Sequence, residues 1–320
     1  MARAASGTRK DFLSVLDFDG ADLDRCLELA AQVKADRPLG RQAPTANALE
    51  GRHVAMLFEK ASLRTRSTFE IAVHELGGHV VALHPDAALG QREPVADVAR
   101  NLERWFDAVV IRTFSQRLLQ EFAAAAPRLH VVNALSDSEH PCQAVADMLT
   151  LREQWGTLRG RTIAYVGDGN NVAVSLAHAA TIMGAHVHVA SPDGYQLPDG
   201  AVQQATSVAR HGARLRLFND AIDAVAGADA IYTDTWTSMG QESEAILRRD
   251  IFSPYQVNEA LMSLAKPNAL FMHCLPAHRE EEVTADVLES AASVVFDQAE
   301  NRLHGQKALL LMLLSGAPAR

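Results

Sequence analysis

Short apolar runs rich in β-branched residues alternate along the chain with longer segments in which apolar residues recur every three or four positions. The short runs have the length and composition of buried strands, and the longer segments have the period of amphipathic helices. The pattern predicts strands at residues 53–58, 80–83, 108–111, 130–132, 162–166, 186–190, 214–217, 230–233, 270–272 and 294–296. It predicts helices at residues 66–76, 93–105, 143–155, 172–183 and 202–211.

This alternation predicts an α/β fold. Strands that are joined by helices pair in parallel, and the helices cover the faces of the sheet. Ten strands suit two such sheets better than one, and 320 residues are enough for two domains of about 150 residues each. Gly156, Gly160 and polar neighbours interrupt the pattern just before the strand that begins at Thr162. The helix that begins near Pro141 would then connect the two domains.

Composition limits the classes of binding partner and the cellular compartment that the sequence predicts. Apolar residues make up 48% and charged residues 22% of the chain, the balance of an ordinary globular protein. The 30 basic and 39 acidic residues leave a net charge of −9, so nucleic acid and anionic membranes are poor partners. No apolar run reaches the roughly 18 residues of a membrane span. The odd number of cysteines, Cys26, Cys142 and Cys274, indicates a reducing cytoplasm.

The segment Ser62-Leu63-Arg64-Thr65-Arg66 lies where the first predicted strand gives way to a helix. In open parallel sheets, ligands bind where strands end. A helix N-terminus offers unpaired N–H groups and a partial positive charge, to which the hydroxyl and guanidinium groups of this segment add donors. The sequence therefore favours a phosphate site here. The simpler alternative is a capped helix with surface arginines.

Two further strand ends carry polar groups. Arg112 ends a strand that reads as buried, where it would form a structural ion pair or stabilise negative charge on a substrate oxygen. His140-Pro141-Cys142-Gln143 opens a helix, and His140 would cap this helix or donate to a carbonyl oxygen. A third interpretation is a zinc site formed by His140, Cys142, His273 and Cys274, but the spacing of these residues matches no structural zinc pattern well.

The later strand ends suggest an amino-acid substrate. Gly167-Asp168-Gly169-Asn170-Asn171-Val172 lacks the third glycine of a dinucleotide turn, and no acid ends the next strand, so a nicotinamide dehydrogenase is disfavoured. Asn170 and Asn171 could hold a carboxylate or an amine, or form a simple turn. Asp234 could pair with an ammonium, and Ser238-Met239-Gly240 reads as a flexible loop beyond it. Adjacent residues on an extended segment point in opposite directions, so His273 and Cys274 are not a catalytic pair by sequence alone.

Four of these motifs, taken in order, resemble the aspartate/ornithine carbamoyltransferase family, and within it the ornithine branch. They are Ser62 to Arg66, His140 to Gln143, Asp234 to Gly240 and His273 to Pro276. The resemblance implies two α/β domains with the active site in the cleft between them. It implies a carbamoyl-phosphate domain at 1–147 plus 303–320 and an ornithine domain at 148–302. It also implies a homotrimer or a multiple of trimers, with no metal and no organic cofactor.

The resemblance further implies transfer of the carbamoyl group from carbamoyl phosphate to the δ-amine of L-ornithine, which gives L-citrulline and phosphate. The residues implied in catalysis are Arg112, His140 and Cys274. Those implied in carbamoyl-phosphate binding are Ser62, Leu63, Arg64, Thr65, Arg112, His140, Pro141, Cys142, Gln143, Cys274, Leu275 and Arg302. Those implied in ornithine binding are Asn171, Asp234, Ser238 and Met239.

Two positions depart from the family pattern. Leu63 stands where threonine is usual, and Ala88 stands where a glutamine that reaches a neighbouring subunit is frequent. Relatives that act on acylated ornithine also tolerate an apolar residue at this position, so this substrate stays open as an alternative, as does putrescine. The segment Ser238-Met239-Gly240 argues against putrescine, because an α-amino-acid end needs that loop.

Overall fold

The computed structural model describes residues 11–59, 62–89, 92–238 and 240–315. The chain divides into two compact units: unit 1 comprises Met1–Val145 with Arg302–Arg320, and unit 2 comprises Ala146–Asn301. Two helices run from one unit into the other, α6 (Pro141–Trp155) and α13 (Val295–Leu314). The C-terminal part of α13 therefore belongs to the same unit as the N-terminal half of the chain.

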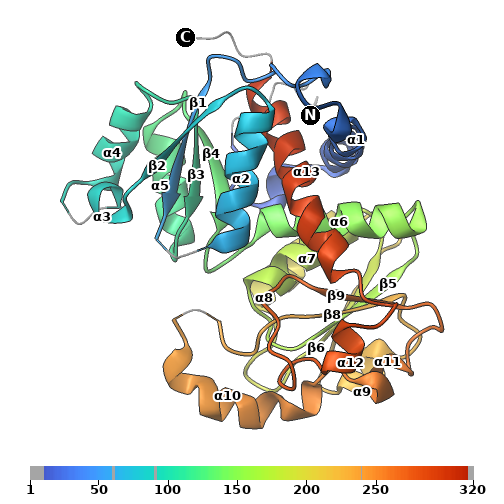
Figure 1. Ribbon diagram of the computed structural model, residues 1–320. Helices are drawn as coiled ribbons and strands as arrows, with labels where there is room; N and C mark the ends of the chain where they lie inside the picture. Colours follow the sequence, from blue (N-terminus) through green and yellow to red (C-terminus); the bar gives the residue numbers. More distant parts are fainter. Residues whose placement is uncertain (1–10, 60–61, 90–91, 239, 316–320) are drawn as a thin grey trace. The chain divides into compact units, whose positions relative to one another are not determined.

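Unit 1 is built on a four-stranded parallel sheet of order β2-β1-β3-β4. Its strands are β1 (His53–Phe58), β2 (His79–Leu83), β3 (Ala108–Arg112) and β4 (His130–Leu135). Its other helices are α1 (Gly20–Asp36), α2 (Leu63–Glu75), α3 (Pro85–Ala88), α4 (Val95–Leu102) and α5 (Gln116–Ala125), with 3₁₀ turns at Val15–Asp17 and Arg37–Gln42. Leu57 of β1, Ile111 of β3, Val98 of α4 and Phe122 of α5 belong to one buried apolar cluster. Figure 1 shows the helices of this unit beside its sheet.

Unit 2 contains a five-stranded parallel sheet of order β7-β6-β5-β8-β9. Its strands are β5 (Thr162–Val166), β6 (His186–Ala190), β7 (Leu215–Phe218), β8 (Ala230–Thr233) and β9 (Leu270–His273). Its remaining helices are α7 (Asn171–Ile182), α8 (Asp199–Val208), α9 (Ala221–Val225), α10 (Ala245–Phe252), α11 (Glu259–Met262) and α12 (Ala285–Leu288), with 3₁₀ turns at Glu242–Glu244 and Ser253–Tyr255.

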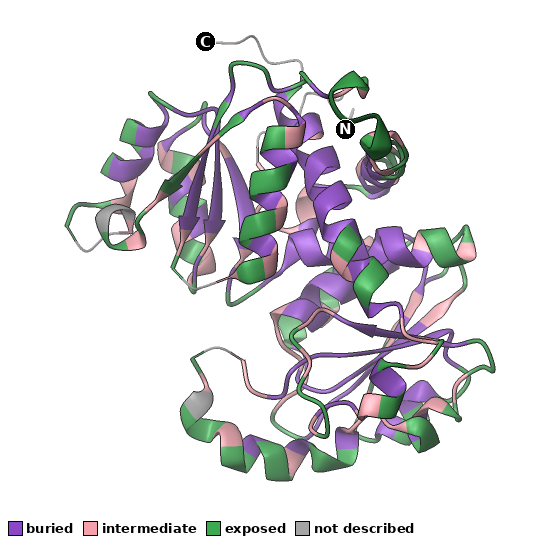
Figure 2. Ribbon diagram, in the orientation of Figure 1, coloured by how far each residue is buried: buried purple, intermediate pink, exposed green. Residues whose placement is uncertain are grey.

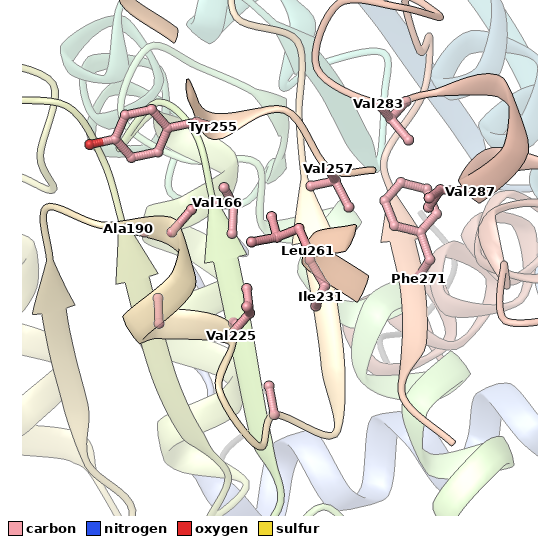
Figure 3. Packing of buried hydrophobic residues seen from close by; sticks show 14 of the residues in the cluster. Val166, Ala190, Val225, Ile231, Tyr255, Val257, Leu261, Phe271, Val283 and Val287 are labelled. Carbon is pink, nitrogen blue, oxygen red and sulfur yellow. The ribbon is translucent and has the colours of Figure 1, made fainter. Parts of the chain in front are cut away.

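The core of unit 2 joins the sheet to the helices on one of its faces. Val166, Ile231 and Phe271 project from three neighbouring strands toward Leu261 of α11 and Val287 of α12 (Figure 3). The central strands β5 and β8 are buried along nearly their whole length, as is α7, whereas α8 and α10 have exposed faces (Figure 2). Near-continuous apolar strands are expected when helices cover both faces of a parallel sheet.

Each sheet has a point at which the strand order reverses. In unit 1 the chain proceeds from β1 to β2 on one side and to β3 and β4 on the other, so the reversal lies between β1 and β3. In unit 2 it lies between β5 and β8. Beyond the carboxyl ends of such strands the connections diverge, which leaves room for a ligand. The register places Phe58 opposite Arg112, and Val166 opposite Thr233, at these ends.

The amino ends of the same strands carry structural ion pairs. Arg52 precedes β1 and its Nη1 lies 2.8 Å from Asp107 Oδ1, while Asp107 Oδ2 accepts from the His53 backbone N–H. Unit 2 repeats this arrangement, because Arg161 pairs with Asp229 and Asp229 accepts from the backbone N–H at the start of β5. The two sheets thus bear anchoring charges at the edge opposite to their strand carboxyl ends.

Most of the predicted elements are confirmed. The strands at 53–58, 162–166, 186–190 and 230–233 have the predicted bounds, and five others differ by one to three residues at an end. The strand predicted at 294–296 is wrong, because α13 begins at Val295. Val294 N–H donates to Phe271 O and Phe271 N–H donates to Ala292 O, which makes a single bridge to β9. The residues that follow form the helix α13. Among the described residues, none of the helices combines the length and apolar composition needed to cross a lipid bilayer.

Candidate active site

The first turn of α2 follows β1 and presents its amides at the sheet reversal of unit 1. Ser62 has an extended backbone at the N-cap, and its side chain makes no capping bond. The Leu63 side chain is 78% exposed, whereas Thr65 is buried. The backbone N–H of Leu63 is among the first N–H groups of α2. The N-terminal amides and helix dipole together favour an anion.

Arg302 of α13 joins three helices of unit 1. Its Nη1 donates to Gln143 Oε1 of α6 at 2.6 Å, and its Nη2 donates to Thr65 Oγ1 of α2 at 2.8 Å. All three side chains are almost fully buried. Both acceptors are neutral, so these two bonds orient the guanidinium without neutralising its charge.

Glu59 ties the end of β1 to the end of β3. Its backbone N–H donates to Arg112 O at 2.9 Å. Its carboxylate Oε2 accepts from Thr113 Oγ1 at 2.5 Å and from Phe114 N at 3.0 Å. These bonds hold the turn that follows β3, at the point where the strand register shifts between Ile111 and Arg112. The position of Arg112 is therefore set from the neighbouring strand.

His140 lies directly before α6, and its backbone carbonyl accepts from Gln143 N at 3.0 Å. Burial lowers the pKa of His140 well below its ordinary value, and the charges of Arg302, Arg112 and Arg64 lower it further. The imidazole is therefore neutral at physiological pH. Three arginines from separate segments thus create a positive potential around a neutral ring.

Cys142 is a buried residue of the same helix. Its thiol donates to Asn133 O at 3.3 Å, and burial raises its pKa to about 12. Burial also raises the pKa of the Cys26 thiol to about 12. Neither thiol is a nucleophile at neutral pH, because the reactive form is the thiolate.

In unit 2, Asp234 follows β8 and receives hydrogen bonds from three neutral donors. Asn170 Nδ2 lies 2.8 Å from Oδ2, and Thr235 N and Cys274 Sγ lie 2.8 and 3.0 Å from Oδ1. Asn170 also caps α7, since its Oδ1 accepts from Val172 N and the next amide. The helix therefore fixes the amide that holds Asp234, and Asn171 begins the first turn beside it.

Arg248 of α10 holds the loop that continues from Asp234. Its Nε donates to Trp236 O at 2.6 Å, and its Nη2 forms an ion pair with Asp168 in the turn after β5. The guanidinium lies over the Tyr195 ring, 4.8 Å from the centroid. Arg248 is only 3% exposed. A buried cation with these contacts ties three loops at the carboxyl edge of the sheet.

Asp234, His273 and Cys274 have potential metal-ligand atoms within 4.8 Å of one another. Cys274 donates to Asp234, and His273 Nδ1 accepts from Leu275 N at 2.8 Å. A metal ion would have to displace these bonds. His278, Glu281 and Glu282 form a second such group, nearer the surface.

Two family profiles match nearly the whole chain. The profile described as "Aspartate/ornithine carbamoyltransferase, carbamoyl-P binding domain" matches residues 10–153. The profile described as "Aspartate/ornithine carbamoyltransferase, Asp/Orn binding domain" matches residues 159–313. The chain belongs to the aspartate/ornithine carbamoyltransferase family. The predicted resemblance and the α/β fold class of two parallel sheets are thereby confirmed.

Similar proteins from several organisms are named ornithine carbamoyltransferase. An ornithine carbamoyltransferase of Parafrankia sp. (strain EAN1pec) is 49% identical over 314 residues, which are 98% of this chain and 98% of the relative. That of Thermosynechococcus vestitus is 49% identical and covers 95% and 96%. The solved ornithine carbamoyltransferase from Pyrococcus furiosus has a TM-score of 0.93 at 46% identity, covering 98% of this chain and 100% of that chain.

The predicted carbamoyltransferase residues divide between the units. Unit 1 holds Ser62, Leu63, Arg64, Thr65, Arg112, His140, Pro141, Cys142, Gln143 and Arg302. Unit 2 holds Asn171, Asp234, Ser238, Cys274 and Leu275. Met239 lies outside the described residues, as does the side chain of Ala88. Within each unit the predicted residues gather at the carboxyl ends of the strands, and their roles stay predictions.

Sequence reasoning missed three residues whose hydrogen bonds hold segments next to the predicted site residues: Glu59, Arg248 and Glu282. Glu59 directly follows a strand, so its position was a usable signal. Arg248 lies in a charged helix and resembles a surface residue until the fold buries it. Glu282 lies in a run of three glutamates, Glu280 to Glu282, of which it alone is fully buried.

The pH dependence of unfolding should report on Asp168. Burial raises its pKa from 3.8 to about 6, despite Arg248, and the nearby Asp234 adds to the rise. Between pH 4 and 6 the folded carboxyl holds a proton that the unfolded one has lost. The resulting stabilisation is present below pH 4 and is lost as the pH rises through 6. In Asp168→Asn this loss of roughly 2–3 kcal/mol in the free energy of unfolding should be absent. Urea unfolding at pH 4 and at pH 7 measures the difference. Asp250→Asn, an exposed change on α10, should keep the wild-type dependence. An unchanged slope in Asp168→Asn would contradict the assignment.

Proposed function

We propose that this protein transfers the carbamoyl group of carbamoyl phosphate to the δ-amine of L-ornithine, with L-citrulline and phosphate as products. One observation carries the proposal: Arg64, Arg112 and Arg302 surround a neutral His140 at the reversal of the first sheet. This arrangement suits a dianion joined to a polarisable carbonyl. The names of the relatives that match the whole chain favour ornithine as the acceptor.

In this proposal unit 1 binds carbamoyl phosphate. Ser62, Thr65, Arg64 and the backbone at Leu63 hold the phosphate at the start of α2. Arg112, His140 and Gln143 hold the carbamoyl group, and Arg302 orients Thr65 and Gln143 through its two hydrogen bonds. Pro141 and Cys142 shape the first turn of α6, where the buried Cys142 thiol is directed at Asn133 O.

Unit 2 binds the amino acid. The carboxylate of Asp234 accepts from the neutral donors Asn170, Thr235 and Cys274, so its negative charge suits an ammonium. Asn171, Ser238 and Met239 are the other proposed contacts for the α-amino-acid end. Cys274 and Leu275 complete the carbamoyl pocket, with Cys274 as a positioning group or proton acceptor rather than a nucleophile.

The chemistry follows from these placements. The deprotonated δ-amine attacks the carbamoyl carbon, and negative charge grows on the carbonyl oxygen. Arg112, His140 and Thr65 stabilise this oxygen, and Arg64 with the N-terminus of α2 stabilises the departing phosphate. No covalent enzyme intermediate is required. Alignment of two bound substrates can supply a large part of the rate, up to roughly 7–11 kcal/mol.

We further propose a homotrimer in the cytoplasm that needs no metal and no organic cofactor. The proposed domains are 1–147 plus 303–320 for carbamoyl phosphate and 148–302 for ornithine. The predicted location of the reaction between these domains stays a prediction.

A panel of amines tests the proposal. Carbamoyl phosphate is mixed at pH 8.5 with ornithine, putrescine, N-acetylornithine or aspartate, and the ureido product is measured. Ornithine should give the highest kcat/KM, because Asp234 and the loop after it suit an α-amino-acid end. Product from putrescine or N-acetylornithine but not ornithine would reassign the acceptor, and product from none would refute carbamoyl transfer.

Replacing Arg64 should weaken carbamoyl-phosphate binding. Loss of a charged hydrogen bond lowers affinity by about 10- to 100-fold. Calorimetric titration of Arg64→Ala measures this loss. Arg117→Ala removes an equal charge from an exposed site on α5 and should bind normally. Equal affinities for the two variants would refute the phosphate assignment.

The pH profile should reflect the substrate and not His140. The pKa of His140 lies well below 6.5, so the ring stays neutral from pH 6.5 to 9 and adds no inflection. The amine of ornithine titrates near ~10, so kcat/KM for ornithine should rise across this range. His140→Asn should lower kcat by about a hundredfold while the rise persists. A rise that disappears in this variant would show that His140 titrates instead.

A further inference from the structure

The strongest unassigned feature is a buried histidine–glutamate pair behind the Cys274 turn. His273 ends β9 and Glu282 lies in the loop before α12, and both side chains are 0% exposed. His273 Nε2 lies 3.1 Å from Glu282 Oε1. Burying such a pair stabilises a fold less than apolar packing would, so a geometric role explains it better.

The hydrogen bonds of His273 determine its tautomer. Leu275 N donates to His273 Nδ1 at 2.8 Å, so Nδ1 carries no proton in this arrangement. The ring proton is then on Nε2, where it is donated to Glu282. Glu282 Oε1 also accepts from His278 N at 2.6 Å, which anchors the carboxylate to its own loop. Glu282 thus favours the proton on Nε2 and leaves Nδ1 free of a proton, so that Nδ1 can accept from Leu275 N.

The bond to Leu275 holds an unusual backbone conformation. Leu275 has a φ of 57°, in the left-handed region of backbone conformation. Residues other than glycine, asparagine and aspartate rarely adopt this region. Such a conformation persists only where the surroundings impose it. The acceptor on His273, two residues earlier, supplies this constraint. The main chain of His273 is itself held, because its N–H donates to Gln298 Oε1 at 3.1 Å.

The turn sets the direction of the neighbouring thiol. Cys274 lies between His273 and Leu275, and its Sγ donates to Asp234 Oδ1 at 3.0 Å. We infer that His273 is a positioning residue that, with Glu282, holds the turn at Leu275 and so aims the Cys274 thiol at Asp234. The inference rests on the proposed function, in which Cys274, Leu275 and Asp234 contact the substrates.

Two substitutions separate the roles of the two ring nitrogens. His273→Asn places an amide oxygen where Nδ1 lies, so it can accept from Leu275 N, but it does not reach Glu282. His273→Gln reaches toward Glu282 but leaves Leu275 N without its acceptor. Both remove the ring, so both lose similar packing.

Kinetics of citrulline formation and urea unfolding are measured for both variants. His273→Asn should retain a kcat about tenfold or more above that of His273→Gln. Their unfolding midpoints should agree within about 0.3 M urea. The inference would be overturned by an equal kcat in both variants or by a higher kcat in His273→Gln. It would also be overturned if the difference in kcat were matched by a difference in the free energy of unfolding.

Glu282 is tested by the same logic. Glu282→Gln keeps an acceptor for His273 Nε2 and should retain kcat within about threefold of the wild type. Glu282→Leu removes the acceptor, so the ring proton is no longer directed to Nε2, and kcat should fall to the level of His273→Gln. Equal activity of the two Glu282 variants would exclude the proposed role of the carboxylate.

Alkylation of Cys274 by iodoacetamide, followed by peptide mass spectrometry, is a readout that does not need turnover. Cys26 and Cys142 are buried and serve as internal references. The Cys274 rate in His273→Asn should lie within about twofold of the wild type, and that in His273→Gln should differ by about fivefold or more. If this contrast appears while the wild type makes no citrulline, the proposed function fails and the positioning inference stands. Equal rates in all three proteins would overturn the positioning inference alone.

Discussion

Parallel strand direction is the constraint on which both units depend. It brings all strand carboxyl ends to one edge of each sheet, and the reversal of strand order opens room there between β1 and β3 and between β5 and β8. The amino ends carry the ion pairs Arg52–Asp107 and Arg161–Asp229 instead. Groups that stabilise the sheets and groups that can bind ligands therefore lie at opposite edges, so the binding edge can vary without loss of the anchors.

At each of these edges one charged side chain is held by hydrogen bonds to neutral groups. In unit 1, Arg302 donates to the neutral acceptors Thr65 and Gln143, and burial, together with the nearby arginines, lowers the pKa of His140 and keeps that ring neutral. In unit 2, Asp234 accepts from the neutral donors Asn170, Thr235 and Cys274. Neutral partners orient a charged group without cancelling its field. One unit is thus suited to a phosphate dianion and the other to an ammonium group, and the net charge of −9 shows neither.

Local patterns predicted the elements where local and tertiary preferences agree. The apolar runs of β1, β5 and β8 are bounded by polar or glycine residues and could be located within a residue. Val294 to Phe296 has the same apolar character, but the residues from Asp297 onward favour helix, and the segment joins α13 after a single bridge at Ser293. A run of three residues contains too little periodicity to separate a strand from the first turn of a helix.

The sequence by itself determined the family, the α/β class and the residue types that follow each strand, because these depend on periodicity and on motifs of contiguous residues. Only the tertiary structure decided which side chains are buried and what they contact. Arg302 lies more than two hundred residues from Thr65, and Glu282 is distinguished from its neighbours Glu280 and Glu281 only by burial. Hydrogen bonds such as Arg302–Thr65 and His273–Glu282 depend on distances across the fold, and the spacing of residues along the chain contains no measure of those distances.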